Sequence, residues 1–143
     1  MKKIEALGLS LLLNISLSYG QTIETQIKVI GIRSERGNIK LTIFKDSEGF
    51  EKSQPVKNLV FQKKAIVGGN LILTFKIEPG IYGIILLDDE NSNGKMDKNF
   101  IRMPKEGFGF SNFMMKFKKP SFDDFKVNLT SDPSKTEIKV RYF

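Results

Sequence analysis

Apolar and polar residues alternate one by one along most of this chain, and this pattern constrains the fold more than any other feature. The segments with this alternation are 27–31, 39–43, 71–77 and 138–142. A period of two places one face of a strand on a core and the other in water. No segment shows a capped apolar stripe with the helical period, so the pattern predicts an all-β protein.

The segment 81–87 differs because it is apolar almost throughout, which predicts a central strand buried on both faces. Shorter apolar runs at 59–61, 65–67 and 125–129 bring the expected number of strands to about seven. Hairpin-length turns are predicted at 34–37 and 68–70, a Pro-Gly turn at 78–80, and short helices at 47–51 and after Asp97. Short strands with frequent turns predict an antiparallel β-sandwich of the immunoglobulin-like kind.

The N-terminus has the pattern of a cleaved secretory signal peptide. Lys2 and Lys3 precede a mostly apolar stretch at 6–17, and Ser18 and Gly20 provide small residues before Gln21. A membrane anchor needs about 20 apolar residues, which this stretch does not reach. The sequence therefore predicts a signal peptide at 1–20, cleavage near Gly20-Gln21, and a single secreted or periplasmic domain at 21–143 without a transmembrane segment.

His and Cys, two residue types that carry much of enzyme chemistry, are absent from the chain. The chain contains no His, no Cys and no Trp, which excludes a Ser-His-Asp triad, a Cys nucleophile and the usual zinc, haem and iron–sulfur sites. Without residues 1–20 the 23 basic and 16 acidic residues become 21 and 15, a net charge of +6. The basic residues are spread along strand faces, which disfavours nucleic-acid binding. Only paired carboxylates remain as a route to an enzyme.

An acidic and amide-rich loop follows the most apolar strand and carries the clearest chemical signal. Its oxygen donors stand at positions 1, 3, 5 and 9 of a calcium loop, with Gly94 at the sharp bend and a backbone carbonyl at position 7. The residues in these places are Asp89, Asn91, Asn93, Asp97 and, for the carbonyl, Lys95. The spacing predicts a Ca²⁺ site, and Mg²⁺ is disfavoured because it rarely occupies an all-protein cage.

The final ligand of such a loop is missing, because position 12 is Phe100 instead of a bidentate Glu. A closing carboxylate would have to come from Glu106, Asp123 or Asp124. With two carboxylates in the loop, a weak affinity of about 10⁻⁴–10⁻³ M is expected. A metal-free turn is the alternative, since Asn93-Gly94 is also a strong type I′ turn signal.

A Phe-rich connection covers residues 100–125. It holds seven of the twelve Phe residues of the chain, so it is too apolar to lie free in water. We expect a Gly/Phe-rich loop that folds back to cap one end of the sandwich. The alternative is a ligand surface formed by exposed rings of Phe108, Phe110 and Phe113.

The order of these motifs resembles the DUF2141 family of small exported bacterial proteins. The resemblance rests on the strand at 81–87 followed by the segments 89–97, 104–112 and 120–124. The turn at 78–82 is also similar to the Pro-Gly-x-Tyr turn of transthyretin-like and carboxypeptidase-regulatory-like β-sandwiches. In the family a His often precedes the loop, where this chain has Asp88. The resemblance implies that the loop and a set of supporting residues form one feature. These residues are Asp88, Glu106, Ser111, Asn112, Asp123 and Asp124.

We therefore expect a non-catalytic binding or structural module at the cell envelope, stabilised by weakly bound Ca²⁺. Its partner would be an envelope protein or a polysaccharide. One alternative is a polysaccharide-active enzyme that uses paired carboxylates among Asp88, Asp89, Glu106, Asp123 and Asp124. The other is a metal-free protein-interaction scaffold that uses an edge strand or exposed Phe side chains.

Overall fold

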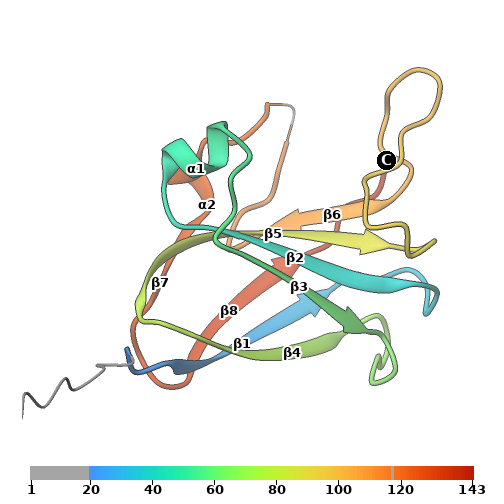
Figure 1. Cartoon of the computed structure of the whole chain (residues 1–143). Coiled ribbons are helices and arrows are strands. Elements are labelled where there is room, and N and C mark those ends of the chain that lie inside the picture. Colours follow the sequence, from blue (N-terminus) through green and yellow to red (C-terminus); the bar gives the residue numbers. More distant parts are fainter. Residues whose placement is uncertain (1–19, 117) are drawn as a thin grey trace, which may run out of the picture.

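Eight strands form two sheets packed face to face, with two short helices on the outer side of the larger sheet (Figure 1). The computed structural model describes residues 20–116 and 118–143, so the predicted signal peptide lies outside the described residues except for Gly20. The elements are β1 (Ile23–Ile30), β2 (Asn38–Phe44), α1 (Ser47–Glu51), β3 (Lys57–Gln62), β4 (Leu71–Ile77), β5 (Gly80–Asp89), β6 (Gly107–Phe110), α2 (Phe122–Phe125), β7 (Lys126–Leu129) and β8 (Ser134–Lys139).

The β-sandwich expected from the alternation is confirmed. One sheet has the order β4-β1-β8, and the other has the order β3-β2-β5-β6, with β7 also paired to β5. All pairs are antiparallel except β1 and β8, which run parallel. The sequence pattern does not indicate this parallel pair, because alternation is the same in both kinds of strand.

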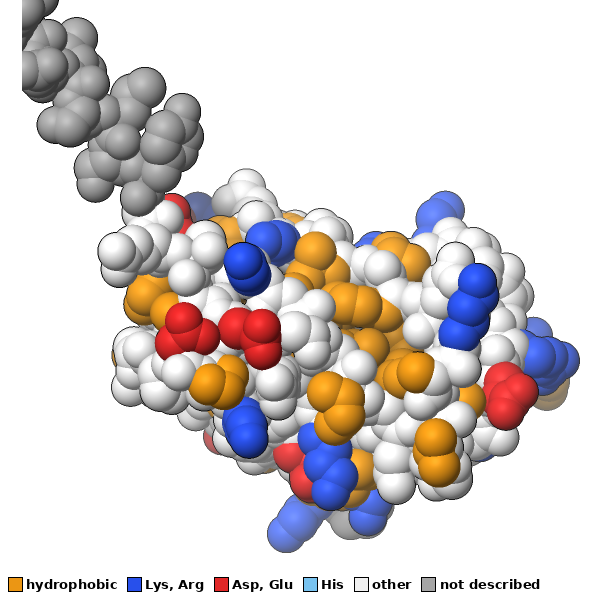
Figure 2. All heavy atoms as spheres, turned by 90° about the horizontal axis from the view of Figure 1, so that it is seen from below, with side chains coloured by type: hydrophobic (Ala, Val, Ile, Leu, Met, Phe, Trp, Pro, Cys, Tyr) orange, Lys and Arg blue, Asp and Glu red, His pale blue; other side chains and the backbone are white. Residues whose placement is uncertain are grey.

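The main core lies between the two sheets and is built from the alternate residues of each strand that point inward. In β4, for instance, Leu71, Leu73, Phe75 and Ile77 are buried, and the residues between them are exposed. On β5 the inward phase is Tyr82, Ile84 and Leu86, and it continues to Asp88. The face seen from the side of the three-stranded sheet mixes apolar with charged side chains (Figure 2).

A second apolar cluster covers the outer face of the five-stranded sheet. Its buried members are Phe44, Phe108, Phe110, Phe122 and Phe125. This cluster buries the other face of β5, as its apolar sequence predicts. A Cβ atom on Gly83 would lie 2.5 Å from Phe125 Cε2 and 2.8 Å from Phe122 Cε2, so the absence of a side chain lets these rings pack on the strand. The Phe-rich segment thus covers a sheet face and not the end of the sandwich.

Several local expectations differ from the structure. Residues 65–67 form no strand, and the region after Asp97 forms no helix, whereas the helix at 47–51 is confirmed. The turns at 34–37, 68–70 and 78–80 each connect strands of different sheets. At 68–70 the chain also reverses tightly, and Val67 and Asn70 pair as an isolated antiparallel bridge. The last strand begins at Ser134, because Ser134 and Thr136 are small enough to be buried in the inward phase. No helix among the described residues is long and apolar enough to cross a membrane.

Candidate functional site

The acidic and amide-rich loop begins at the end of β5, where Asp89 is buried at 1% exposure. Its carboxylate accepts hydrogen bonds from the backbone N–H groups of Asn93 (3.1 Å) and Gly94 (2.7 Å). Gly94 has a φ of 76°, a left-handed conformation that favours glycine. Asp89 therefore holds the loop in a tight reversal and keeps part of its oxygen surface for other partners.

Two of the predicted metal-binding residues, Asn91 and Asn93, bind a third one, Asp97. Its carboxylate accepts hydrogen bonds from the side-chain amides of Asn91 (2.6 Å) and Asn93 (2.9 and 3.0 Å). These hydrogen bonds, first from Asn91 and then from Asn93, lower the pKa of Asp97 below its usual value. The backbone N–H of Lys95 donates to Asn93 Oδ1 at 2.9 Å. The loop is thus folded around the Asp97 carboxylate.

Glu106 comes directly before β6 and reaches the loop from there. The pairing of β5 with β6 ends with Asp88 opposite Gly107, and the negative charge of Asp89 at the end of β5 acts on Glu106. Glu106 is only 4% exposed, and its Oε2 accepts a hydrogen bond from the Asp97 N–H at 3.2 Å. Its Oε1 is buried without a hydrogen-bond partner among the described residues.

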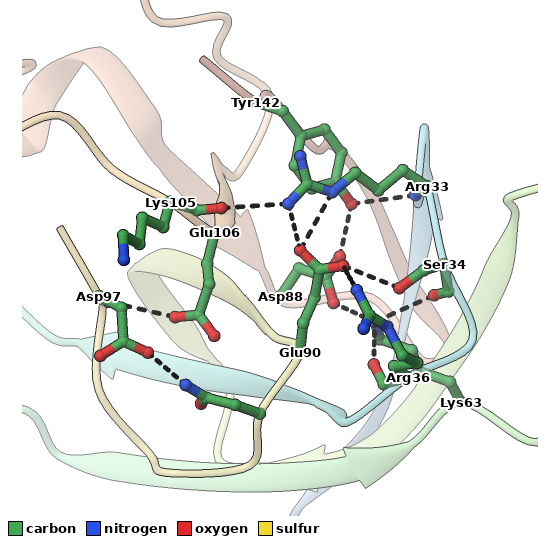
Figure 3. Close-up of polar contacts among 11 residues, drawn as sticks. Arg33, Ser34, Arg36, Lys63, Asp88, Glu90, Asp97, Lys105, Glu106 and Tyr142 are labelled. Carbon is green, nitrogen blue, oxygen red and sulfur yellow. Dashed lines mark hydrogen bonds and ion pairs between the residues drawn. The ribbon is translucent and has the colours of Figure 1, made fainter. Parts of the chain in front are cut away.

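This position makes ionisation of Glu106 unfavourable. Burial raises the pKa of Glu106, and the negative charges of Asp97 and Asp89 raise it further. A surface hollow of about 400 Å³ lies beside the carboxylate, lined by Asn91, Asp97 and Glu106 together with basic residues (Figure 3). Among residues 20–116 and 118–143, no group of three or more Asp, Glu, His or Cys side chains is arranged to hold a metal ion. A cation here would therefore need amide or backbone oxygens as well as carboxylates.

Behind the loop lies a buried polar network on the opposite face of β5 (Figure 3). Asp88 forms an ion pair with Lys63 and accepts a hydrogen bond from the Tyr142 hydroxyl. The Lys63 ammonium also donates to the backbone carbonyls of Ser34 (3.1 Å) and Arg36 (2.7 Å). Burial and the Asp88 hydrogen bond raise the pKa of Tyr142 well above its usual value. Asp88 Oδ1 has the ion pair with Lys63 but no hydrogen bond, and the contacts of Lys63 and Tyr142 hold this end of the sandwich together.

Glu90 connects the loop to the turn after β1. It accepts hydrogen bonds from Arg33 Nε (3.0 Å) and from the Ser34 hydroxyl (2.9 Å). The hydrogen bond from Arg33 lowers the pKa of Glu90 below its usual value. Arg33 in turn donates to the Lys105 carbonyl at 3.1 Å, next to Glu106. Glu90 therefore ties the start of the loop to the turn after β1, and Arg33 ties that turn to the Lys105 backbone.

The other predicted supporting residues do not join this site. Ser111 accepts from the Ile84 N–H (3.0 Å) and donates to the Phe125 carbonyl (2.6 Å), so it connects β5 to α2. Asn112 accepts from the Thr136 hydroxyl at 3.0 Å. Asp123 pairs with Lys126, and Asp124 accepts from the Ser121 N–H and hydroxyl at the start of α2. The prediction that all of these form one feature is wrong, because, of these residues, only Glu106 hydrogen-bonds to the loop, at the Asp97 N–H.

The predicted ligand surface of Phe108, Phe110 and Phe113 is also corrected. Phe108 and Phe110 are each 8% exposed, and Phe113 is half-buried against them. The ring centroids of Phe110 and Phe125 are 5.2 Å apart, as in a packed aromatic core. Phe108 and Phe110 belong to β6 and pack in the apolar cluster with Phe122 and Phe125, which removes their rings from water.

Sequence reasoning missed Lys63 as a site residue, although a signal for it exists. In β3 the odd-numbered residues face inward, and Lys63 continues that phase directly after the strand. A charged residue in the inward phase of a strand must be paired when it is buried. The same argument applies to Asp88, which continues the inward phase of β5.

The fold and the site together define a small β-sandwich domain with an acidic and amide-rich loop at one edge of its larger sheet. The chain belongs to the DUF2141 family, described as an uncharacterised protein conserved in bacteria, whose sequence profile matches residues 27–138. This match confirms the family resemblance and spans nearly all of the sandwich. No curated protein and no solved structure shows a significant match to this chain.

Proposed function

We propose that the protein is an exported, non-catalytic binding or structural module of the cell envelope, stabilised by Ca²⁺ at the acidic and amide-rich loop. The unpartnered Oε1 of Glu106 is the observation that carries this proposal. A buried carboxylate oxygen without a partner is costly, and the negative charges of Asp97 and Asp89 add repulsion. A divalent cation between Glu106 and the loop would remove both costs.

The donor set suits a hard cation. Asp89, Asp97 and Glu106 would supply carboxylate oxygens, Asn91 and Asn93 amide oxygens, and Lys95 a carbonyl. The three carboxylates would have to move together around the ion, since no three such groups are arranged to hold one among the described residues. The amide nitrogens of Asn91 and Asn93 point to Asp97, so each amide would turn to present its oxygen to the ion. This competition with existing hydrogen bonds supports the weak affinity expected of extracellular calcium sites, about 10⁻⁴–10⁻³ M.

The state of the other carboxylates supports a non-catalytic role. Asp88 is held by Lys63 and Tyr142, while Asp123 and Asp124 belong to α2 and bind their own neighbours. Among the five candidate carboxylates, Asp89 and Glu106 come near each other, since the charge of Asp89 acts on Glu106. Both are nearly fully buried, whereas a glycosidase pair must flank a substrate.

Thermal unfolding in EDTA and in Ca²⁺ tests the proposal. All described elements lie between Ile23 and Lys139, so a protein that begins at Gln21 keeps the whole fold. At a tenfold excess over the dissociation constant, Ca²⁺ should stabilise the folded state by about 1.4 kcal/mol. The unfolding midpoint should then rise by roughly 3–6 °C. Mg²⁺ should have a smaller effect.

Two variants make the test specific. Asp97→Ala should abolish the rise, whereas Asp123→Ala should keep it, since Asp123 is exposed on α2 and pairs only with Lys126. An unchanged midpoint up to about 10 mM Ca²⁺, or a rise that survives Asp97→Ala, would overturn the proposed site.

A further inference from the structure

A finger-shaped hairpin of residues 98–105 projects away from the sheets, visible as the yellow-orange loop after β5 (Figure 1). At its base the Lys105 N–H donates to the Asp97 carbonyl at 2.8 Å, and Lys98 and Pro104 form a β-bridge. Further along, the Asn99 N–H donates to the Met103 carbonyl at 2.9 Å. We call residues 98–105 the finger.

The tip of the finger presents apolar side chains to solvent. Phe100 is 97% exposed, Ile101 is 64% exposed and Met103 is 40% exposed. The backbone beneath them is ordered by Asn99, whose side-chain oxygen accepts hydrogen bonds from the N–H groups of Ile101 (3.1 Å) and Met103 (3.0 Å). A Phe that is almost fully exposed on an ordered turn contributes nothing to the core, so its apolar surface is free for another partner.

Basic residues lie at the tip and at the base of the finger: Arg102 is next to Ile101, whereas Lys98 and Lys105 are at the base and also line the hollow beside Asp97 and Glu106. The finger contains Lys98, Arg102 and Lys105 and no acidic residue, so it carries a charge of +3 over eight residues. All three basic side chains belong to exposed residues. An apolar tip with cations beside it and at its base matches the order of a bilayer surface, where apolar chains lie beneath anionic headgroups.

The shape of the finger distinguishes a bilayer from a protein partner. A stable protein interface buries about 800 Å² on each side and involves some 20–30 residues, far more than one hairpin tip offers. A bilayer needs no complementary surface, because it accepts any apolar group that reaches below its headgroups. We propose that the finger inserts Phe100 and Ile101 into an anionic phospholipid bilayer, while Lys98, Arg102 and Lys105 bind the lipid phosphates.

Membrane insertion by the finger does not require Ca²⁺ at the neighbouring loop. The finger begins directly after Asp97 and ends directly before Glu106, so a bound cation would fix both of its ends. The hydrogen bonds within the finger order it without an ion. Vesicle binding should therefore be measurable in EDTA, where loss of the calcium site cannot explain a negative result.

Co-sedimentation with vesicles tests the insertion. The protein that begins at Gln21 should bind vesicles of mixed phosphatidylcholine and phosphatidylglycerol in EDTA, and bind phosphatidylcholine alone at least about tenfold more weakly. The double variant Phe100→Ser, Ile101→Ser should lose at least about tenfold of this binding. Ile72→Ser is the matched control, since Ile72 is 57% exposed on β4, outside the finger, and its replacement should leave binding unchanged.

The finger variant should fold normally, because its two side chains lie in solvent, and an unchanged unfolding midpoint verifies this. Equal vesicle binding by wild type and finger variant would overturn the proposal. So would equal binding to vesicles with and without phosphatidylglycerol. Absence of binding to both compositions would overturn it as well and would direct attention to a protein partner.

Discussion

Lys63 and Asp88 form an ion pair in which both side chains are almost completely removed from solvent, at 1% and 0% exposure. Removing one partner of such a pair leaves an uncompensated buried charge. We expect Lys63→Met to lower the free energy of unfolding by about 3–5 kcal/mol. Urea denaturation followed by circular dichroism measures this loss.

A double variant separates the charge from the packing. Asp88→Asn keeps an acceptor for the Tyr142 hydroxyl but carries no charge. Lys63→Met combined with Asp88→Asn should therefore be more stable than Lys63→Met alone. If the two single losses simply add in the double variant, the ion pair does not couple these residues.

Glu106→Gln should have opposite effects without and with Ca²⁺. In EDTA the substitution removes a buried acidic group whose Oε1 has no hydrogen-bond partner among the described residues and which lies near the charges of Asp97 and Asp89, so it should raise the free energy of unfolding by about 1 kcal/mol. In Ca²⁺ the variant should gain less stability than the wild type, since the amide is a weaker ligand than the carboxylate. Thermal unfolding of both proteins under both conditions measures the two effects.

The pH dependence of this variant follows from the raised pKa of Glu106, which is due to burial and to the charges of Asp97 and Asp89. The folded protein binds the proton more tightly than the unfolded chain, so stability without metal falls as pH rises through the window above the ordinary pKa of Glu. The advantage of Glu106→Gln over the wild type should therefore grow as the pH rises above the ordinary pKa of Glu, about 4.3. A constant difference across this range would contradict the assignment.

Tyr142 should destabilise the fold when the solution becomes alkaline. Its pKa is raised by burial and by the hydrogen bond to Asp88, so the folded state retains a proton that the unfolded chain loses near pH 10. Stability should fall as the pH rises above about 10. Tyr142→Phe should be less stable at neutral pH by about 1–3 kcal/mol, because Asp88 loses a donor, and should show a smaller alkaline loss. Chemical denaturation at a series of pH values compares the two proteins.

Gly83→Ala should destabilise the protein by about 1–3 kcal/mol through overpacking, because the new methyl group would collide with the rings of Phe122 and Phe125. Phe125→Leu in the same chain should recover part of this loss by opening space beside Cβ. The denaturation midpoints of the two single variants and the double variant measure the recovery. If Gly83→Ala lowers the stability equally with Phe and with Leu at position 125, contact with the Phe125 ring is not the cause of the loss.

The sequence predicted the sandwich because burial alternates residue by residue along each strand. In β2 and β4 the apolar positions identify the buried face without reference to the rest of the chain. The loop from Asp89 to Asp97 was also predictable, since its donors and Gly94 lie within nine residues. Its calcium binding stays a prediction.

The pairing of strands could not be predicted in this way. The parallel pair of β1 and β8, and the placement of three predicted turns between different sheets, depend on contacts between distant residues. The same limit explains why Asp123 and Asp124 were grouped with the loop. Their order along the chain resembles a family pattern, but α2 places them beside Ser121 and Lys126.

The sequence by itself thus determined the fold class, the buried face of each clear strand and the chemical character of the loop. Only the tertiary structure decided that Glu106 binds the Asp97 N–H, that Lys63 neutralises Asp88, and that Phe100 is exposed while Phe108 and Phe110 are buried. Alternation and turn preferences are local properties of the chain. Strand register and packing are set by the burial of the whole apolar surface at once, which no single segment encodes.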